Sequence, residues 1–138
     1  MTDEDFLATF EAAALAPGEF NHRAHLRVAY LYLCRLPFLE ACLAMRDGLR
    51  RFAVQIGKPG LYHETLTVAF MSLLAERIAD APGADWVSFA DANPALFDRE
   101  LLAAYYQPAT LASEAARRRL VLQPWVPIKR AEVGDVTA

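Results

Sequence analysis

The chain has little cysteine and no excess of positive charge, and each shortage excludes a class of protein. Two cysteines, Cys34 and Cys42, among 138 residues are too few for a disulfide-stapled secreted domain, so we expect buried free thiols. A net charge of −3 provides no basic field for nucleic acid or an anionic membrane surface. No apolar run approaches the ~18 residues of a membrane span, and the acidic start is unlike a secretory signal. We therefore expect a cytoplasmic protein with neither nucleic-acid nor membrane partners.

Apolar residues make up 55% of the chain and charged residues 22%, which excludes a disordered protein. A chain of 138 residues can bury a real core, so we expect residues 1–138 to form a single domain. No nucleotide or flavin motif is present.

Hydrophobic periodicity, capping residues and proline-glycine breaks predict an all-α fold: a single compact bundle of four longer helices. The longer helices are expected at residues 3–16, 22–36, 37–56 and 62–80. Two or three short helices should follow, within residues 85–92, 95–107 and 111–120. Residues 124–138 contain few periodic positions and are expected to form an extended strap and a frayed tail. The helix at 22–36 is apolar nearly all round, which is typical of a central, buried helix.

All three histidines of the chain, His22, His25 and His63, fall in the first turn of an expected helix. His22 and His25 are three residues apart and therefore share a helix face. If the second, third and fourth helices run up, down and up, the second and fourth start at the same end of the bundle. The three histidines are then expected to converge there.

Three neutral histidines with one open position form the ligand set of a catalytic metal. We therefore expect His22, His25 and His63 to hold a divalent transition metal: zinc, iron, manganese or nickel. Glu64 is the expected fourth ligand or proton-shuttling carboxylate, and Tyr62 is expected to donate a hydrogen bond to a developing oxyanion.

Arg23 and Arg27 lie close in sequence to the histidine pair and are the expected binding residues for an anionic substrate group. These assignments describe a hydrolase or lyase that acts on a small anionic molecule. In such an enzyme the metal would lower the pKa of a bound water or polarise a carbonyl.

The run Phe20-x-His22-x-x-His25-Leu26, followed by Tyr62-His63-Glu64-Thr65, resembles a family of uncharacterised short bacterial proteins. The later segment from Tyr105-Tyr106 through Leu111-x-Ser113 also resembles that family, and the resemblance spans residues 20–128. It implies that both histidine motifs belong to one pattern, and it implies no reaction.

Two alternatives remain open at this point. The same pocket could bind a small ligand without a metal, as a binding or acid/base site. Alternatively, the histidines could be purely structural in an interaction protein, with the apolar seam of the helix at 37–56 and the Trp125 strap burying a homodimer partner.

Overall fold

The computed structural model describes residues 1–123, which form seven α-helices and three 3-10 helices without any strand. The all-α prediction is confirmed. The longer helices are α1 (Asp3–Glu11), α2 (His22–Arg35), α3 (Phe38–Gln55) and α4 (Glu64–Asp80). The shorter elements are η1 (Pro59–Leu61), α5 (Trp86–Ala92), η2 (Pro94–Phe97), η3 (Leu101–Ala104), α6 (Pro108–Leu111) and α7 (Glu114–Arg118). The predicted strap at residues 124–138 lies outside the described residues.

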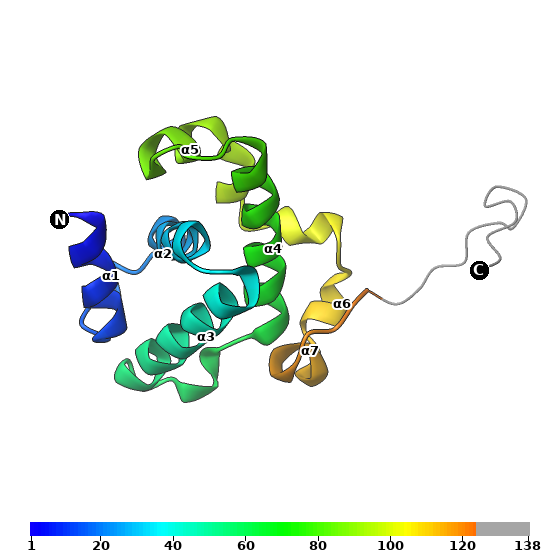
Figure 1. Ribbon diagram of the computed structural model, residues 1–138. Helices are drawn as coiled ribbons and strands as arrows, with labels where there is room; N and C mark the ends of the chain where they lie inside the picture. The colour runs from blue at the N-terminus through cyan, green and yellow to red at the C-terminus, as the bar shows by residue number, and fades with distance from the viewer. Residues whose placement is uncertain (124–138) are drawn as a thin grey trace, which may run out of the picture.

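Helix α2 lies at the centre of the molecule, as its apolar surface predicts. It contacts α1, α3, α4 and α5, and Figure 1 shows these four helices arranged around it. Most of its length is buried on every side, from Val28 to Tyr32 without interruption. The Asn21 side chain caps its first turn by accepting a hydrogen bond from the Ala24 N–H at 2.9 Å.

Helices α2 and α4 cross instead of running parallel. Figure 1 shows α2 nearly end-on, whereas α4 runs along the page. A helix that is apolar all round has no single seam to align with one neighbour, so it can pack across several helices at once. The first turn of α2 therefore meets the body of α4 through His22 and Phe70, whose ring centroids lie 5.5 Å apart.

Helix α1 ends at Glu11 and not near residue 16, because a Schellman motif terminates it. Ala13 adopts a left-handed conformation with φ +53°, and the Ala14 N–H bonds to the Thr9 carbonyl oxygen. The same motif ends α3, where Gly57 has φ +76° and the Lys58 N–H bonds to the Ala53 carbonyl oxygen. Gly57 predicts the end of α3, because glycine readily adopts a left-handed conformation. Ala13 gives no such signal, so the end of α1 was not predicted.

The expected helix at residues 95–107 is replaced by two 3-10 helices, η2 and η3. Asp98 interrupts the helical path with an extended backbone, and its side chain accepts a hydrogen bond from the Glu100 N–H at 2.9 Å. Leu96 and Leu102, one on each side of this turn, are both buried. The turn places Arg99 between them, where it reaches the site described below.

Two further sequence expectations can be compared with the described residues. No helix within residues 1–123 is both long and apolar enough to cross a bilayer. Both cysteines are free, but only Cys42 is buried; Cys34 is exposed on α2, contrary to the expectation that both would be buried.

Candidate functional site

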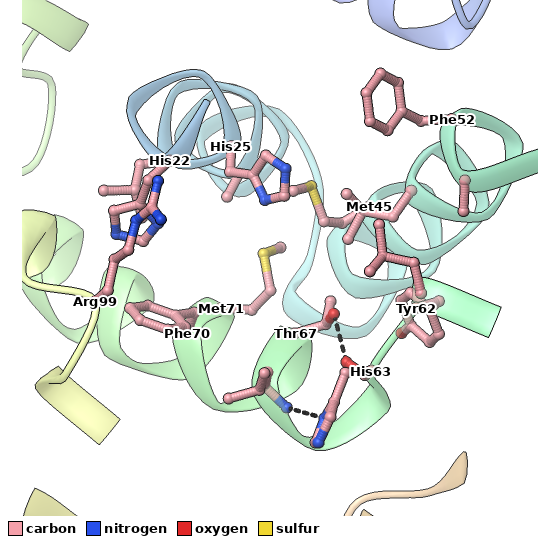
Figure 2. A pocket seen from close by; sticks show the side chains of 16 residues that line it. His22, His25, Met45, Phe52, Tyr62, His63, Thr67, Phe70, Met71 and Arg99 are labelled. Atoms are coloured by element: carbon pink, nitrogen blue, oxygen red, sulfur yellow. Dashed lines mark hydrogen bonds between the residues drawn. The ribbon is translucent and has the colours of Figure 1, made fainter. Parts of the chain in front are cut away.

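A cavity of about 320 Å³ lies between α2, α3 and α4, and all three histidines line it. Figure 2 shows His22 and His25 at one end and His63 at the other, with Met71 and Thr67 between them. Most of the lining is apolar, and no Asp or Glu of the described residues belongs to it. This volume falls at the small end of the range for ligand pockets, which runs from roughly 300 to 1,000 Å³.

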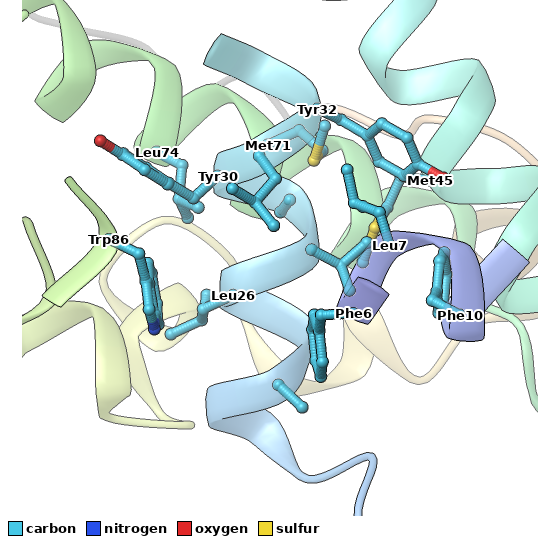
Figure 3. Packing of buried hydrophobic residues seen from close by; sticks show 14 of the residues in the cluster. Phe6, Leu7, Phe10, Leu26, Tyr30, Tyr32, Met45, Met71, Leu74 and Trp86 are labelled. Carbon is cyan, nitrogen blue, oxygen red and sulfur yellow. The ribbon is translucent and has the colours of Figure 1, made fainter. Parts of the chain in front are cut away.

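The inner wall of the cavity is shared with the hydrophobic core. Met45 from α3 and Met71 from α4 line the cavity, and both are also buried members of the core cluster around α2 (Figure 3). Thioether side chains are flexible and polarisable, so they can adapt to ligands of varied shape. The apolar part of the site is therefore adjustable, although the helices that carry it are fixed by core packing.

His63 is the N-cap residue of α4, and the protein uses both of its ring nitrogens. Nδ1 accepts a hydrogen bond from the Leu66 N–H at 3.1 Å, so Nε2 carries the proton and donates to the Leu111 carbonyl oxygen at 2.8 Å. The side chain is buried. His63 therefore ties the start of α4 to the later segment that carries α6.

His22 has one of its ring nitrogens occupied. Its Nε2 lies 3.1 Å from the Leu96 carbonyl oxygen, and because a carbonyl only accepts, this nitrogen donates. The bond ties the first turn of α2 to η2. Nδ1 has no hydrogen-bond partner within residues 1–123, so it remains available to a ligand.

Neither ring nitrogen of His25 has a hydrogen-bond partner in the described part of the chain. Its ring packs against Phe20, with centroids 3.9 Å apart, and lines the cavity. Burial, followed by the nearby positive charges of His22 and Arg99, lowers the pKa of His25 to about 4. At neutral pH the ring is therefore uncharged and presents both a donor and an acceptor.

Arg99, which the sequence analysis did not single out, also lines the cavity. In Figure 2 it lies next to His22, and it contributes to the lowered pKa of His25. Its side chain is exposed and forms no ion pair with the described acidic residues. Flanked by Asp98 and Glu100 in sequence, it resembles an ordinary solvated arginine, and only the turn between η2 and η3 brings it to the site.

Tyr62 and Glu64 form a pair at the His63 end of the cavity. The Tyr62 hydroxyl donates to Glu64 Oε1 at 2.6 Å, and the Arg50 guanidinium lies 5.1 Å from the centroid of the Tyr62 ring. Burial and this bond to a carboxylate raise the pKa of Tyr62. Tyr62 lines the cavity, whereas Glu64 does not.

Arg23 and Arg27 do not line the cavity, contrary to their predicted place beside the histidines. Arg27 pairs with Asp3 at 2.7 Å and lies over the Phe6 ring, and Arg23 lies over the Trp86 ring, 5.5 Å from its centroid. Both therefore serve the packing of α2 against α1 and α5. The reason is helical geometry: positions 23 and 27 share a face that is rotated away from positions 22 and 25.

The three-histidine metal set stays a prediction, and the geometry sets a condition on it. No group of three or more His, Cys, Asp or Glu side chains within residues 1–123 is arranged to hold a metal ion. To ligate a metal, His63 would have to give up its bond to either Leu66 or Leu111. His22 has one ring nitrogen, and His25 has two, without a hydrogen-bond partner among the described residues.

No model of a known protein family, no curated protein and no solved structure matches this chain.

Proposed function

We propose that this protein binds a small, largely apolar molecule in the cavity between α2, α3 and α4, with His25 and His22 as its polar contacts and without a metal. One observation carries the proposal. His25 lines an apolar cavity with both ring nitrogens free of partners within residues 1–123. The ring is partly buried, so its unpartnered nitrogens face the cavity and are open to a ligand that enters it.

The different hydrogen bonding of the three histidines favours this proposal over a metal-dependent enzyme. His63 is engaged through both nitrogens, and the remaining pair at α2 offers too few ligands for a closed metal site. The apolar lining favours an organic molecule over a hydrated ion.

The homodimer alternative lacks a similar observation. The seam residues Cys42, Met45 and Phe52 on α3 are already buried within the chain. Its other element, the Trp125 strap, lies outside the described residues.

Methyl NMR of protein labelled at its methionines tests the proposal directly. The chain has three methionines; Met45 and Met71 line the cavity, whereas Met1 is exposed at 73% and serves as an internal control. Addition of phenylacetamide or benzyl alcohol should shift the Met45 and Met71 methyl signals and leave Met1 unchanged. If no probe moves these two signals up to its solubility limit, the cavity is a packing void and the proposal fails.

Elemental analysis of untagged protein is a second experiment, which tests whether the protein holds a metal. A stoichiometric transition metal, lost in His22→Ala and in His63→Ala, would favour the metal-dependent hydrolase or lyase over the binding protein. Metal content that is negligible even after incubation with zinc, iron, manganese and nickel would favour the metal-free pocket.

A further inference from the structure

The electrostatics of the cavity define the chemical class of its ligand. We infer that the ligand is an organic monoanion whose acid group is held at the corner formed by Arg99, His22 and His25, with its apolar body against Met45 and Met71. This inference rests on the proposed function and adds the ligand class.

The charge balance of the cavity carries the first step. Among residues 1–123, Arg99 is the only formally charged residue that lines the cavity, and no Asp or Glu of these residues does so. A cation at the exposed edge of an apolar cavity favours a ligand whose anionic group lies at that edge, because the guanidinium forms charge-assisted hydrogen bonds with an acid group.

Several arginines, including Arg77, form no ion pair with the described residues, and Arg99 is the one among them that lines this cavity in the described part of the chain. Arg27 pairs with Asp3, Arg35 with Glu4 and Arg118 with Glu114. Arg99 has no ion pair within residues 1–123, although Asp98 and Glu100 adjoin it in sequence. Asp98 accepts from the Glu100 N–H, and neither carboxylate lines the cavity. The Arg99 guanidinium therefore keeps its fork of donors, which fits a carboxylate.

The neighbouring histidines complete the corner. His25 carries an N–H with no acceptor in the described residues, so it can donate a second hydrogen bond to the acid group. Both histidines project from the first turn of α2, and Figure 2 shows Arg99 approaching His22 from the opposite side. The lowered pKa of His25 is consistent with this arrangement, since burial is its largest cause and the nearby Arg99 guanidinium also contributes. A bound anion would offset that charge and raise the pKa of His25.

The rest of the lining selects the body of the ligand. Beyond the corner the wall includes Met45, Met71, Phe52 and Phe70, and no further charged group from residues 1–123 lines it. Thioether sulfurs and aromatic rings contact a flat apolar ring favourably. A cavity of about 320 Å³ suits a compact body. An inorganic anion would leave this wall without a partner.

Phenylacetate and phenylacetamide form the test pair, because they have nearly the same shape and differ in charge. Binding is followed at pH 7 by calorimetry and by the Met45 and Met71 methyl signals. Phenylacetate should bind about tenfold more tightly than phenylacetamide, a typical value for one charge-assisted contact. Arg99→Gln should remove this difference, whereas Arg77→Gln, which removes an exposed arginine of α4 outside the cavity lining, should preserve it.

A second readout follows the ring of His25 itself. Carbon-13 NMR of the histidine Cε1 should show the pKa of His25 rising when benzylsulfonate is bound, since this sulfonate stays ionised throughout the titration. Phenylacetamide should leave that pKa unchanged.

The outcomes separate the two proposals. If both probes move the methyl signals with equal affinity, the cavity binds ligands but the anion inference is overturned. Phenylacetate that binds Arg99→Gln as tightly as the parent protein overturns it as well, and so does competition by inorganic phosphate at similar concentration. If neither probe reaches the cavity, both proposals fail.

Discussion

Both ends of the cavity carry histidine, but the hydrogen bonding of the histidines differs between the two ends. At one end, hydrogen bonds occupy both ring nitrogens of His63. At the other end, the described residues occupy one nitrogen of His22 and neither nitrogen of His25. All three residues stand at or near the start of a helix, so position along the chain does not separate them. The number of ring nitrogens that the fold itself uses distinguishes a structural histidine from one available to a ligand.

The His63 end is a docking point for the C-terminal part of the described chain. The fully buried Thr65 donates to the Arg119 carbonyl oxygen at 2.8 Å and accepts from the Val121 N–H at 3.0 Å. Arg117 donates to the carbonyl oxygens of residues 60–62. Together with the bond from His63 to Leu111, these contacts fix α6 and α7 to the start of α4. Within residues 1–123, the His22 and His25 end has no comparable set of hydrogen bonds.

The largest effect is expected from His63→Ala. The change leaves the Leu66 N–H and the Leu111 carbonyl without their partners and opens a buried space, so the free energy of unfolding should fall by about 3–4 kcal/mol. Urea denaturation at pH 7 measures the loss. His63→Asn is the matched control, because asparagine can restore the cap but not the bond to Leu111, and it should recover part of the loss. A decrease below about 1 kcal/mol for His63→Ala would contradict a structural role.

The next effect concerns pH and the other end of the cavity. In the unfolded chain His25 titrates near 6.5, and in the folded protein near 4, so between these values the unfolded state binds more protons. Stability should therefore fall as the pH drops from 7 through this window, with His25 contributing about 2 kcal/mol by pH 4.5.

Urea denaturation of the parent and of His25→Leu at both pH values isolates this contribution, because the other titrating groups are common to the two proteins. The parent should lose more stability than the variant between pH 7 and 4.5. Equal losses would show that His25 is not held neutral by its surroundings.

At pH 7, substitution of His22 should cost less stability than substitution of His63 and more than substitution of His25. His22→Phe keeps a ring against Phe70 and removes the bond to the Leu96 carbonyl oxygen, so it should cost about 1 kcal/mol at pH 7. The order of loss, His63 above His22 above His25, follows the number of hydrogen bonds that each ring makes within the protein. A cost for His22→Phe that matches His63→Ala would break this relation.

The sequence allowed much of the fold to be predicted because most helix starts and stops carry chemical signals. Asn21 and Asp85 cap their helices, and Gly57 ends α3. Prediction failed where an ordinary residue took a special conformation, as at Ala13, and where a local turn interrupted a helical pattern, as at Asp98.

The candidate site was less accessible to prediction than the fold, for two different reasons. The sequence contained enough information to separate Arg23 and Arg27 from the histidines, since helical rotation alone places them on another face of α2. Arg99 was different, because it reaches the cavity only through the turn between η2 and η3, the packing of η3 on α4 and the bond of η2 to His22. Nor does spacing reveal which nitrogens of His63 the backbone occupies.

The smallest expected change in stability is at His25, the residue that the proposed function makes the main polar contact to the ligand. In His25→Leu at pH 7 no protein hydrogen bond of the described residues is lost, and an apolar side chain replaces a polar ring, so stability should stay within about 0.5 kcal/mol of the parent. Binding of phenylacetate, followed by the Met45 and Met71 methyl signals, should weaken severalfold in the same variant. Together, a small loss of stability at pH 7 and a large loss of binding would support the proposed role of His25 as a contact to the ligand. If His25→Leu instead unfolds the protein or binds the probe as the parent does, His25 belongs with His63 as a structural residue.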